Sequence, residues 1–208
     1  MAAEAQRRGF YNADRKVFQG DGDQKNWTVQ KVHFPDLTAV TDFVHPVSYV
    51  FDAGQAVTNS LAAQWEQYLD WMTACWRGDV RKVLDELRSW QDRLGSPTSP
   101  PAEGTDPREI LRQTITYLDH NADRMDYPTY RKQGLPITSC LVESVIKQIN
   151  WRVKGAEKFW NRPEGAEVIL QLRAAALSDG DMLGQFVLSR PSSVYYRRGP
   201  ASPPLDPK

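Results

Sequence analysis

Apolar residues recur at helical spacing over the middle of the chain. Between residues 47 and 94 they form two sets on two faces, namely Trp65, Tyr68, Leu69, Met72 and Trp76, and then Val80, Val83, Leu84, Leu87 and Leu94. Such spacing predicts amphipathic helices, and packing alone selects Trp and Tyr at helical intervals. Gly78 and Asp79 supply a break and a new N-cap between the two sets. We therefore expect helices with a helix-bundle core.

A further helix is predicted after a linker. Residues 95–101 (GSPTSPP) are rich in Pro and Ser, which is typical of a connecting segment. Asp106-Pro107-Arg108-Glu109 then opens a helix with Pro at its first position and acids at capping-box spacing, and the pattern continues to about Arg124. Residues 47–124 thus form one helical segment, which we interpret as scaffold.

The sheet content is expected to be small and confined to the first 46 residues. A short polar helix from Ala2 to Tyr11 precedes Val17 and Phe18, which lead into Gly20-Asp21-Gly22 as the end of a strand or a tight turn. The β-branched run 37–43 predicts a second strand that ends near His45. The fold class expected from the pattern is mainly α with a small β component.

The last third of the chain predicts two more helices and a tail. Residues 126–136 hold two prolines and a glycine and are expected to be irregular, after which Ser139 caps a helix. On that helix one stripe carries Glu143, Lys147, Asn150 and Lys154, and the other side, expected to be buried, carries Leu141, Val142, Val145 and Ile149. Another helix begins near Pro163 and ends before Gly180, and residues 181–208 are expected to be a disordered tail.

Composition narrows the class of protein. A hydrophobic fraction of 40% suits a globular protein, and zero net charge excludes a uniformly basic nucleic-acid-binding surface. Residues 1–8 lead into no apolar run, and nowhere do eighteen apolar residues follow one another, so we expect a cytoplasmic protein. Cys75 and Cys140 lack CxxC spacing and are expected to be reduced, buried thiols.

Positive charge is concentrated in one region. Residues 124–162 contain eight Lys or Arg against three acids, a local charge of +5. Two interpretations remain open, a solvated helical face and a track that binds the phosphate backbone of DNA beside an acidic metal site.

Individual candidate residues carry little information by themselves. Asp42 and His45 form a D-x-x-H pattern at the end of a predicted strand, where a locally hydrogen-bonded histidine is the ordinary alternative. Asp21 between two glycines is ordinarily a turn residue. The sequence holds no nucleophile elbow, Gly-rich phosphate loop, Walker sequence or Rossmann fingerprint, which leaves most enzyme classes unsupported.

A longer, ordered set of motifs resembles the C-terminal catalytic region of ISKra-type bacterial insertion-sequence transposases. The set comprises Arg124-Met125-Asp126-Tyr127, Gly134 to Ser139, Val142-Glu143-Ser144, Lys147 to Asn150, Arg152 to Gly155 and Glu157 to Trp160, preceded by Ala5 to Gly9, Gly20-Asp21-Gly22, Asn26-Trp27-Thr28, His33-Phe34-Pro35 and Asp42-Phe43-Val44-His45. The resemblance covers about residues 3–180.

The resemblance implies a metal-dependent DNA transposase related to the Mutator-like group. That group has an RNase H-like α/β core with two aspartates and a glutamate, interrupted by a helical insertion. By position Asp21 resembles the second aspartate, Glu143 the glutamate, and Asp42 with His45 the accompanying signature. Residues 1–46 would be a partial core, 47–124 the insertion and 125–180 the C-terminal catalytic helices.

The implied chemistry needs carboxylates from distant segments. Two Mg²⁺ or Mn²⁺ ions, held here by Asp21 and Glu143, would activate a nucleophile for phosphodiester attack, while Lys147, Arg152, Lys154 and Lys158 would lie near DNA phosphates. Nothing before Asp21 resembles the strand that carries the first aspartate, so we expect little or no transposition by this chain alone.

Departures from the family pattern point the same way. Thr41, Cys140 and Trp151 stand where the family usually has an apolar residue, a small polar residue and an arginine.

The alternative function is a non-catalytic helical module that binds DNA or regulates an intact transposase through a mixed oligomer, with a homo-oligomer as the other expected assembly. A degraded gene product without function is the third reading.

Overall fold

The computed structural model describes residues 2–97, 106–155, 159–178 and 180–189, and it divides the chain into two compact units, Met1–Cys140 and Leu141–Lys208. The described residues are mostly helical and contain one two-stranded parallel sheet, so the prediction of a mainly α fold with a small β component is confirmed. No helix among these residues is long and apolar enough to cross a membrane.

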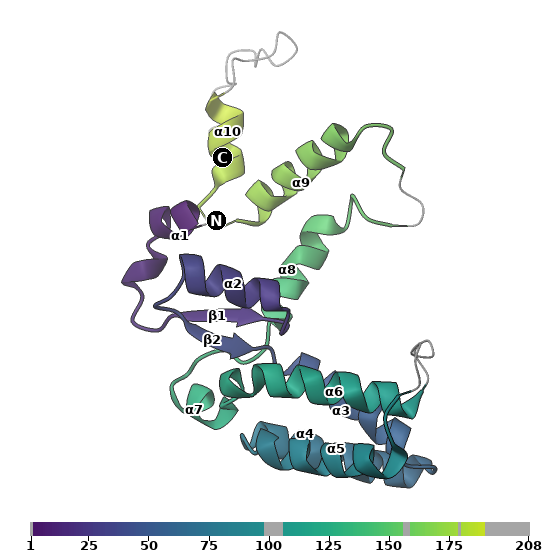
Figure 1. Cartoon of the computed structure of the whole chain (residues 1–208). Helices are drawn as coiled ribbons and strands as arrows, with labels where there is room; N and C mark the ends of the chain where they lie inside the picture. The colour runs from purple at the N-terminus through teal and green to yellow at the C-terminus, as the bar shows by residue number, and fades with distance from the viewer. Residues whose placement is uncertain (1, 98–105, 156–158, 179, 190–208) are drawn as a thin grey trace, which may run out of the picture. The chain divides into compact units, whose positions relative to one another are not determined.

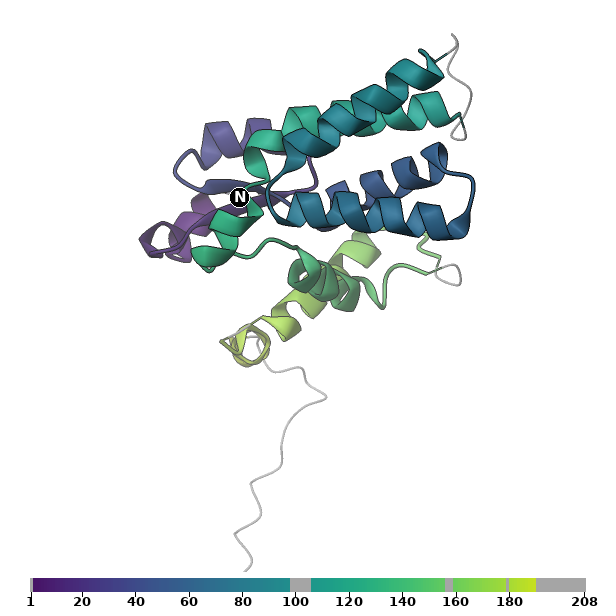
Figure 2. The same ribbon diagram turned by 90° about the horizontal axis from the view of Figure 1, so that it is seen from below.

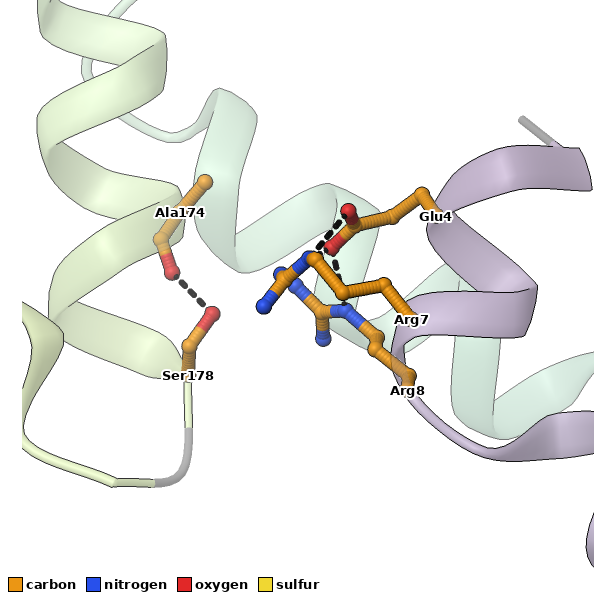
Figure 3. A network of polar contacts seen from close by, with 5 residues as sticks. All are labelled: Glu4, Arg7, Arg8, Ala174 and Ser178. Carbon is orange, nitrogen blue, oxygen red and sulfur yellow. Dashed lines mark hydrogen bonds and ion pairs between the residues drawn. The ribbon is translucent and has the colours of Figure 1, made fainter.

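The first unit begins with helix α1 (Ala2–Arg7) and the 3-10 helix η1 (Phe10–Asn12), where the sequence predicted one helix to Tyr11. Gly9 has a left-handed φ of 73° and separates the two. Within α1, Arg7 and Arg8 both donate to the Glu4 carboxylate (Figure 3). These hydrogen bonds lower the pKa of Glu4 to about 2.

Strands β1 (Val17–Gly20) and β2 (Thr38–Thr41) are parallel and joined by helix α2 (Gln24–His33), in a β-α-β arrangement (Figure 1). The sequence pattern did not predict α2, because its only buried residues are Trp27 and Gln30 and its remaining positions are largely polar. Asp23 caps α2 by accepting from the Lys25 amide. Gln30 donates to the carbonyls of Phe34 and Leu37, which fixes the turn into β2.

Four long helices follow as a bundle in which each contacts two neighbours (Figure 2). They are α3 (Val44–Val57), α4 (Leu61–Trp76), α5 (Val80–Leu94) and α6 (Pro107–Asn121), the last followed by the 3-10 helix η2 (Ala122–Arg124). The predicted break at Gly78 and the predicted start of α6 are both confirmed, and the Asp106 side chain caps α6 by accepting from the Arg108 amide. The sequence did not predict the break between α3 and α4, where the Ser60 side chain caps α4.

The bundle core differs in part from the predicted one. Val80, Val83, Leu84 and Leu87 of α5 are buried as expected. On α4, however, the buried residues are Trp71, Ala74 and Cys75, whereas Trp65 and Trp76 of the predicted aromatic face are exposed. The core face of α4 is therefore rotated from the stripe that the largest side chains suggested, and Trp71 is tied to α5 by its indole N–H, which donates to Glu86 Oε2 at 2.7 Å.

The segment expected to be irregular contains helix α7 (Tyr127–Lys132). Asp126 caps it by accepting from the Thr129 amide, and Pro128 lies in its first turn, where a proline is tolerated because no intrahelical donor is lost. Tyr127 is fully buried and donates from its hydroxyl to the Thr41 carbonyl, which fixes α7 against β2.

The second unit comprises α9 (Pro163–Leu177), α10 (Met182–Ser189) and all but the first residue of α8 (Cys140–Asn150). The prediction that α8 buries its apolar side is wrong, because Leu141, Val142 and Val145 are exposed and Ile149 is only half-buried. Cys140 is also exposed, so only Cys75 is the buried thiol that we expected. The expectation of disorder from residue 181 does not hold for α10, and residues 190–208 lie outside the described residues.

Candidate functional site at the carboxyl ends of the strands

The parallel register of β1 and β2 places two aspartates at the same edge. Gly20 pairs with Thr41 at the end of the ladder, and the next residues are Asp21 and Asp42. The Asp42 amide donates to the Gly20 carbonyl at 2.8 Å, which extends the pairing by one step. Because parallel strands end at one edge of a sheet, both acids leave the sheet at the same place.

Asp21 lies in an ordered turn with an exposed side chain. Its Oδ1 accepts from the Asp23 amide at 2.9 Å and from the Asn26 side-chain amide at 2.8 Å. These bonds form the turn that leads into α2, as expected for an aspartate between glycines. Its Oδ2 has no hydrogen bond to another described residue.

Helix α6 holds this turn from the other side. The Tyr117 hydroxyl donates to the Asp21 carbonyl at 2.8 Å, and the Asn121 side-chain amide donates to the Gly22 carbonyl at 3.4 Å. Asn121 Oδ1 also accepts from the buried Trp27 indole at 2.8 Å, so one amide links α2, α6 and the turn. Tyr117 and Asn121 are four residues apart and therefore share one helical face, a signal that the sequence analysis missed.

Both glycines beside Asp21 have a structural reason. Gly22 has a φ of 98°, and a Cβ there would lie 2.5 Å from Tyr117 Cε2. A Cβ on Gly20 would lie 3.0 Å from the Trp27 ring. Because the two residues that flank Asp21 lack side chains, the backbone of the turn can pack closely against Tyr117 and Trp27.

Asp42 has a structural role. It is 2% exposed, its Oδ1 accepts from the Val44 amide at 3.0 Å, and its Oδ2 accepts from both the amide and the hydroxyl of Ser139. The carboxylate therefore caps the start of α3 and ties it to the residue before α8. Both of its oxygens are engaged by protein donors.

The predicted D-x-x-H pair is brought together. The His45 amide donates to the Asp42 carbonyl at 3.2 Å, and a ring nitrogen of the half-buried His45 lies within 4.8 Å of an Asp42 carboxylate oxygen. The arrangement follows from the helix start: His45 lies in the first turn of α3, which Asp42 caps.

Tyr117 acts as a neutral hydrogen-bond donor at this edge. Burial, followed by the neighbouring Tyr49 and the charges of Asp21 and Asp42, raises the pKa of Tyr117 above its ordinary value. The Tyr49 ring stacks on Tyr117 with centroids 4.0 Å apart. The raised pKa favours the protonated hydroxyl, which is the form that donates to the Asp21 carbonyl.

These residues fit a magnesium site only in part. Mg²⁺ takes oxygen ligands at octahedral positions and is commonly held by one or two carboxylates plus water and phosphate. Within the described residues of the first unit, Asp21 offers an open carboxylate oxygen at this edge, whereas the oxygens of Asp42 already accept three hydrogen bonds. The edge fits one weakly held ion and does not fit the implied pair.

The remaining predicted residues lie in the second unit or outside the described residues. Glu143 is exposed in the first turn of α8. Lys147, Arg152 and Lys154 are exposed at and after the end of α8, and Lys158 lies outside the described residues. The predicted stripe ends with the helix at Asn150, so Lys154 follows it in a turn.

Comparisons of this chain with protein-family models, with curated proteins and with solved structures found no match.

Proposed function

We propose that this chain is the C-terminal portion of a DDE-type DNA transposase with an RNase H-like core, and that it contributes Asp21 to a divalent-metal site. One observation carries the proposal. An aspartate follows each of the two parallel strands of the β-α-β arrangement, and the Asp21 turn is fixed by Gly22, whose φ and close contact require a glycine, and by Tyr117. In α/β proteins, bound substrates and metal ions lie beyond the carboxyl ends of the strands.

Glu143 is the second ligand in this proposal, through the resemblance of its motif. The regional cations Lys147, Arg152 and Lys154 are exposed, as contacts to DNA phosphates require. Lys158 would join them. In this proposal the chain binds metal and DNA, and an intact transposase is its partner.

Metal binding tests the proposal directly. Mn²⁺ titrated into the full chain is followed by the electron paramagnetic resonance signal of the free ion, and wild-type protein is expected to bind it weakly. Asp21→Asn keeps an oxygen that can accept from Asp23 and Asn26 but removes the charge, and Glu143→Gln does the same in α8. Each is expected to weaken Mn²⁺ binding by at least roughly tenfold, because losing even an outer-shell partner of a ligand costs about 10–100-fold in metal affinity.

Two matched controls accompany these variants. Asp36→Asn changes an exposed aspartate before β2, at the opposite end of the sheet, and Glu164→Gln changes an exposed glutamate in the first turn of α9. Both are expected to bind Mn²⁺ like wild type. Equal binding by all five proteins, or none by wild type, would contradict the metal-site proposal.

A second candidate function is a non-catalytic interaction or DNA-binding module. It is favoured by the Asp42 carboxylate, whose oxygens are occupied by structural hydrogen bonds, and by the exposed apolar residues of α8. This candidate predicts that DNA affinity is unchanged in Glu143→Gln and that Mn²⁺ has no effect on it.

A further inference from the structure

The end of helix α8 is held in a defined turn. The amides of Val153 and Lys154 both donate to the Asn150 carbonyl, at 2.8 and 2.9 Å. The Trp160 indole donates to the Val153 carbonyl at 3.0 Å. The turn that follows the helix is thus held by backbone hydrogen bonds and by the Trp160 indole.

Helix α9 fixes the same end through one side chain. Arg173 donates from Nε to the Ile149 carbonyl at 2.9 Å and also reaches the Gln148 carbonyl. A guanidinium at these carbonyls satisfies the last acceptors of α8 and complements the negative end of the helix dipole. Residues 147–154 therefore present their side chains from an ordered backbone.

These side chains line a shallow depression of about 590 Å³, formed by Lys147, Asn150, Trp151 and Lys154. Trp151 is 72% exposed, so most of its side-chain surface is accessible to solvent. Residues 144–155 contain three cations, with Arg152 as the third, and no acid. Glu143 lies one helical turn before Lys147, so cations outnumber acids three to one over residues 143–155. An aromatic surface flanked by an excess of cations is suited to an anion that also carries a flat ring.

We propose that this depression binds an unpaired nucleobase of single-stranded DNA. The base stacks on the Trp151 indole, the ammonium groups of Lys147 and Lys154 contact the flanking phosphates, and the Asn150 amide faces the base edge. The assignment to DNA rests on the proposed function, whereas the preference for an unpaired base rests on the exposed indole. A duplex keeps the faces of its bases stacked on one another, so only an unpaired base offers a face to Trp151.

The test compares fluorescently labelled dT12, rU12 and a 12-base-pair duplex by anisotropy at low salt. Wild-type protein is expected to bind dT12 more tightly than the duplex. Trp151→Ala is expected to weaken dT12 binding about tenfold, or ~1.4 kcal/mol, and to change duplex binding less than about twofold. Trp151→Phe retains a stacking ring and is expected to recover most of the dT12 affinity.

Charge and position are controlled separately. Lys147→Gln and Lys154→Gln are expected to weaken all three ligands and to reduce the salt dependence of binding, because each removes one phosphate contact. Trp65→Ala changes a 55% exposed tryptophan of α4 in the first unit and is expected to bind dT12 like wild type. A parallel loss for dT12 and rU12 in Trp151→Ala supports recognition of either nucleic acid, and a loss for dT12 alone assigns the site to DNA.

The inference and the proposed function fail differently. If Trp151→Ala weakens dT12 and duplex equally or leaves dT12 unchanged, stacking on Trp151 is overturned even where Mn²⁺ binding depends on Asp21. If dT12 binding depends on Trp151 but Mn²⁺ binding is absent, the metal-site proposal fails and the base-stacking inference stands.

Discussion

Gly22 offers the sharpest test of how the Asp21 turn is built. The substitution Gly22→Ala adds one methyl group at a residue with a φ of 98°, and that methyl group would lie 2.5 Å from Tyr117 Cε2 and 2.8 Å from Cζ. Neither the backbone nor the ring can stay as it is. Because Tyr117 is held by Asp21 on one side and by Tyr49 on the other, the ring has contacts to lose when it moves.

The expected cost can be assembled from these contacts. A left-handed backbone costs a residue with a side chain about 1–2 kcal/mol. Displacing the ring weakens the hydrogen bond to the Asp21 carbonyl, worth about 1 kcal/mol, and the stacking on Tyr49, worth a further ~1 kcal/mol. We therefore expect Gly22→Ala to lower the free energy of unfolding by roughly 3–4 kcal/mol.

Urea unfolding followed by circular dichroism measures this change, and Gly95→Ala is the matched control. Gly95 has a φ of 81° and a ψ of 176°, a conformation nearly restricted to glycine, but a Cβ there meets nothing within 4 Å, so its substitution is expected to cost backbone strain alone, about 1–3 kcal/mol. In a Tyr117→Ala background the cost of Gly22→Ala should fall to that of the control, since the ring is gone. Equal destabilisation by Gly22→Ala and Gly95→Ala in the wild-type background would refute the close contact with Tyr117.

Two further predictions concern buried groups near the core. The Thr41 hydroxyl is buried and has no hydrogen-bond partner among the described residues. The isosteric Thr41→Val is therefore expected to raise the free energy of unfolding, measured in urea, by about 1 kcal/mol. A loss of stability would show that the hydroxyl is hydrogen-bonded in solution. Burial raises the pKa of Cys75 to about 12, whereas Cys140 is exposed. One thiol per native chain should therefore react with a thiol reagent at pH 8, and two should react in denaturant. Cys140→Ser should abolish the reaction of the native protein, and a reaction that persists would show that Cys75 is accessible.

Most elements could be predicted where local signals agree. The start of α6 has Asp106 followed by Pro107, and the break before α5 has Gly78 followed by Asp79, and both boundaries lie where the sequence indicated. The apolar positions of α5 recur at helical spacing, and those from Val80 to Leu87 are buried. Capping and periodicity are properties of neighbouring residues, so the sequence contains them in full.

The sequence predictions that the structure contradicts share a different cause. Helix α2 lacks an apolar stripe because Trp27 supplies most of its burial, and its hydrogen-bond partner Asn121 lies 94 residues away in sequence. Pro128 was interpreted as a breaker, although Asp126 two residues earlier makes it part of a helix start. On α4 the largest aromatic residues suggested the wrong core face, since which face is buried depends on the helices packed against it.

For the candidate site, the sequence by itself determined that an aspartate between glycines follows one strand, that an acid and a histidine follow the next, and that cations gather after residue 124. Only the tertiary structure decided that the two strands are parallel neighbours, that Asp42 is committed to Val44 and Ser139, and that Tyr117 requires Gly22 to be a glycine. The physical reason is the distance along the chain between interacting residues. Turn and cap hydrogen bonds join residues a few positions apart, whereas the strand register joins residues 21 positions apart and the contacts of Tyr117 and Ser139 join residues 96 and 97 positions apart, which meet only in the folded chain.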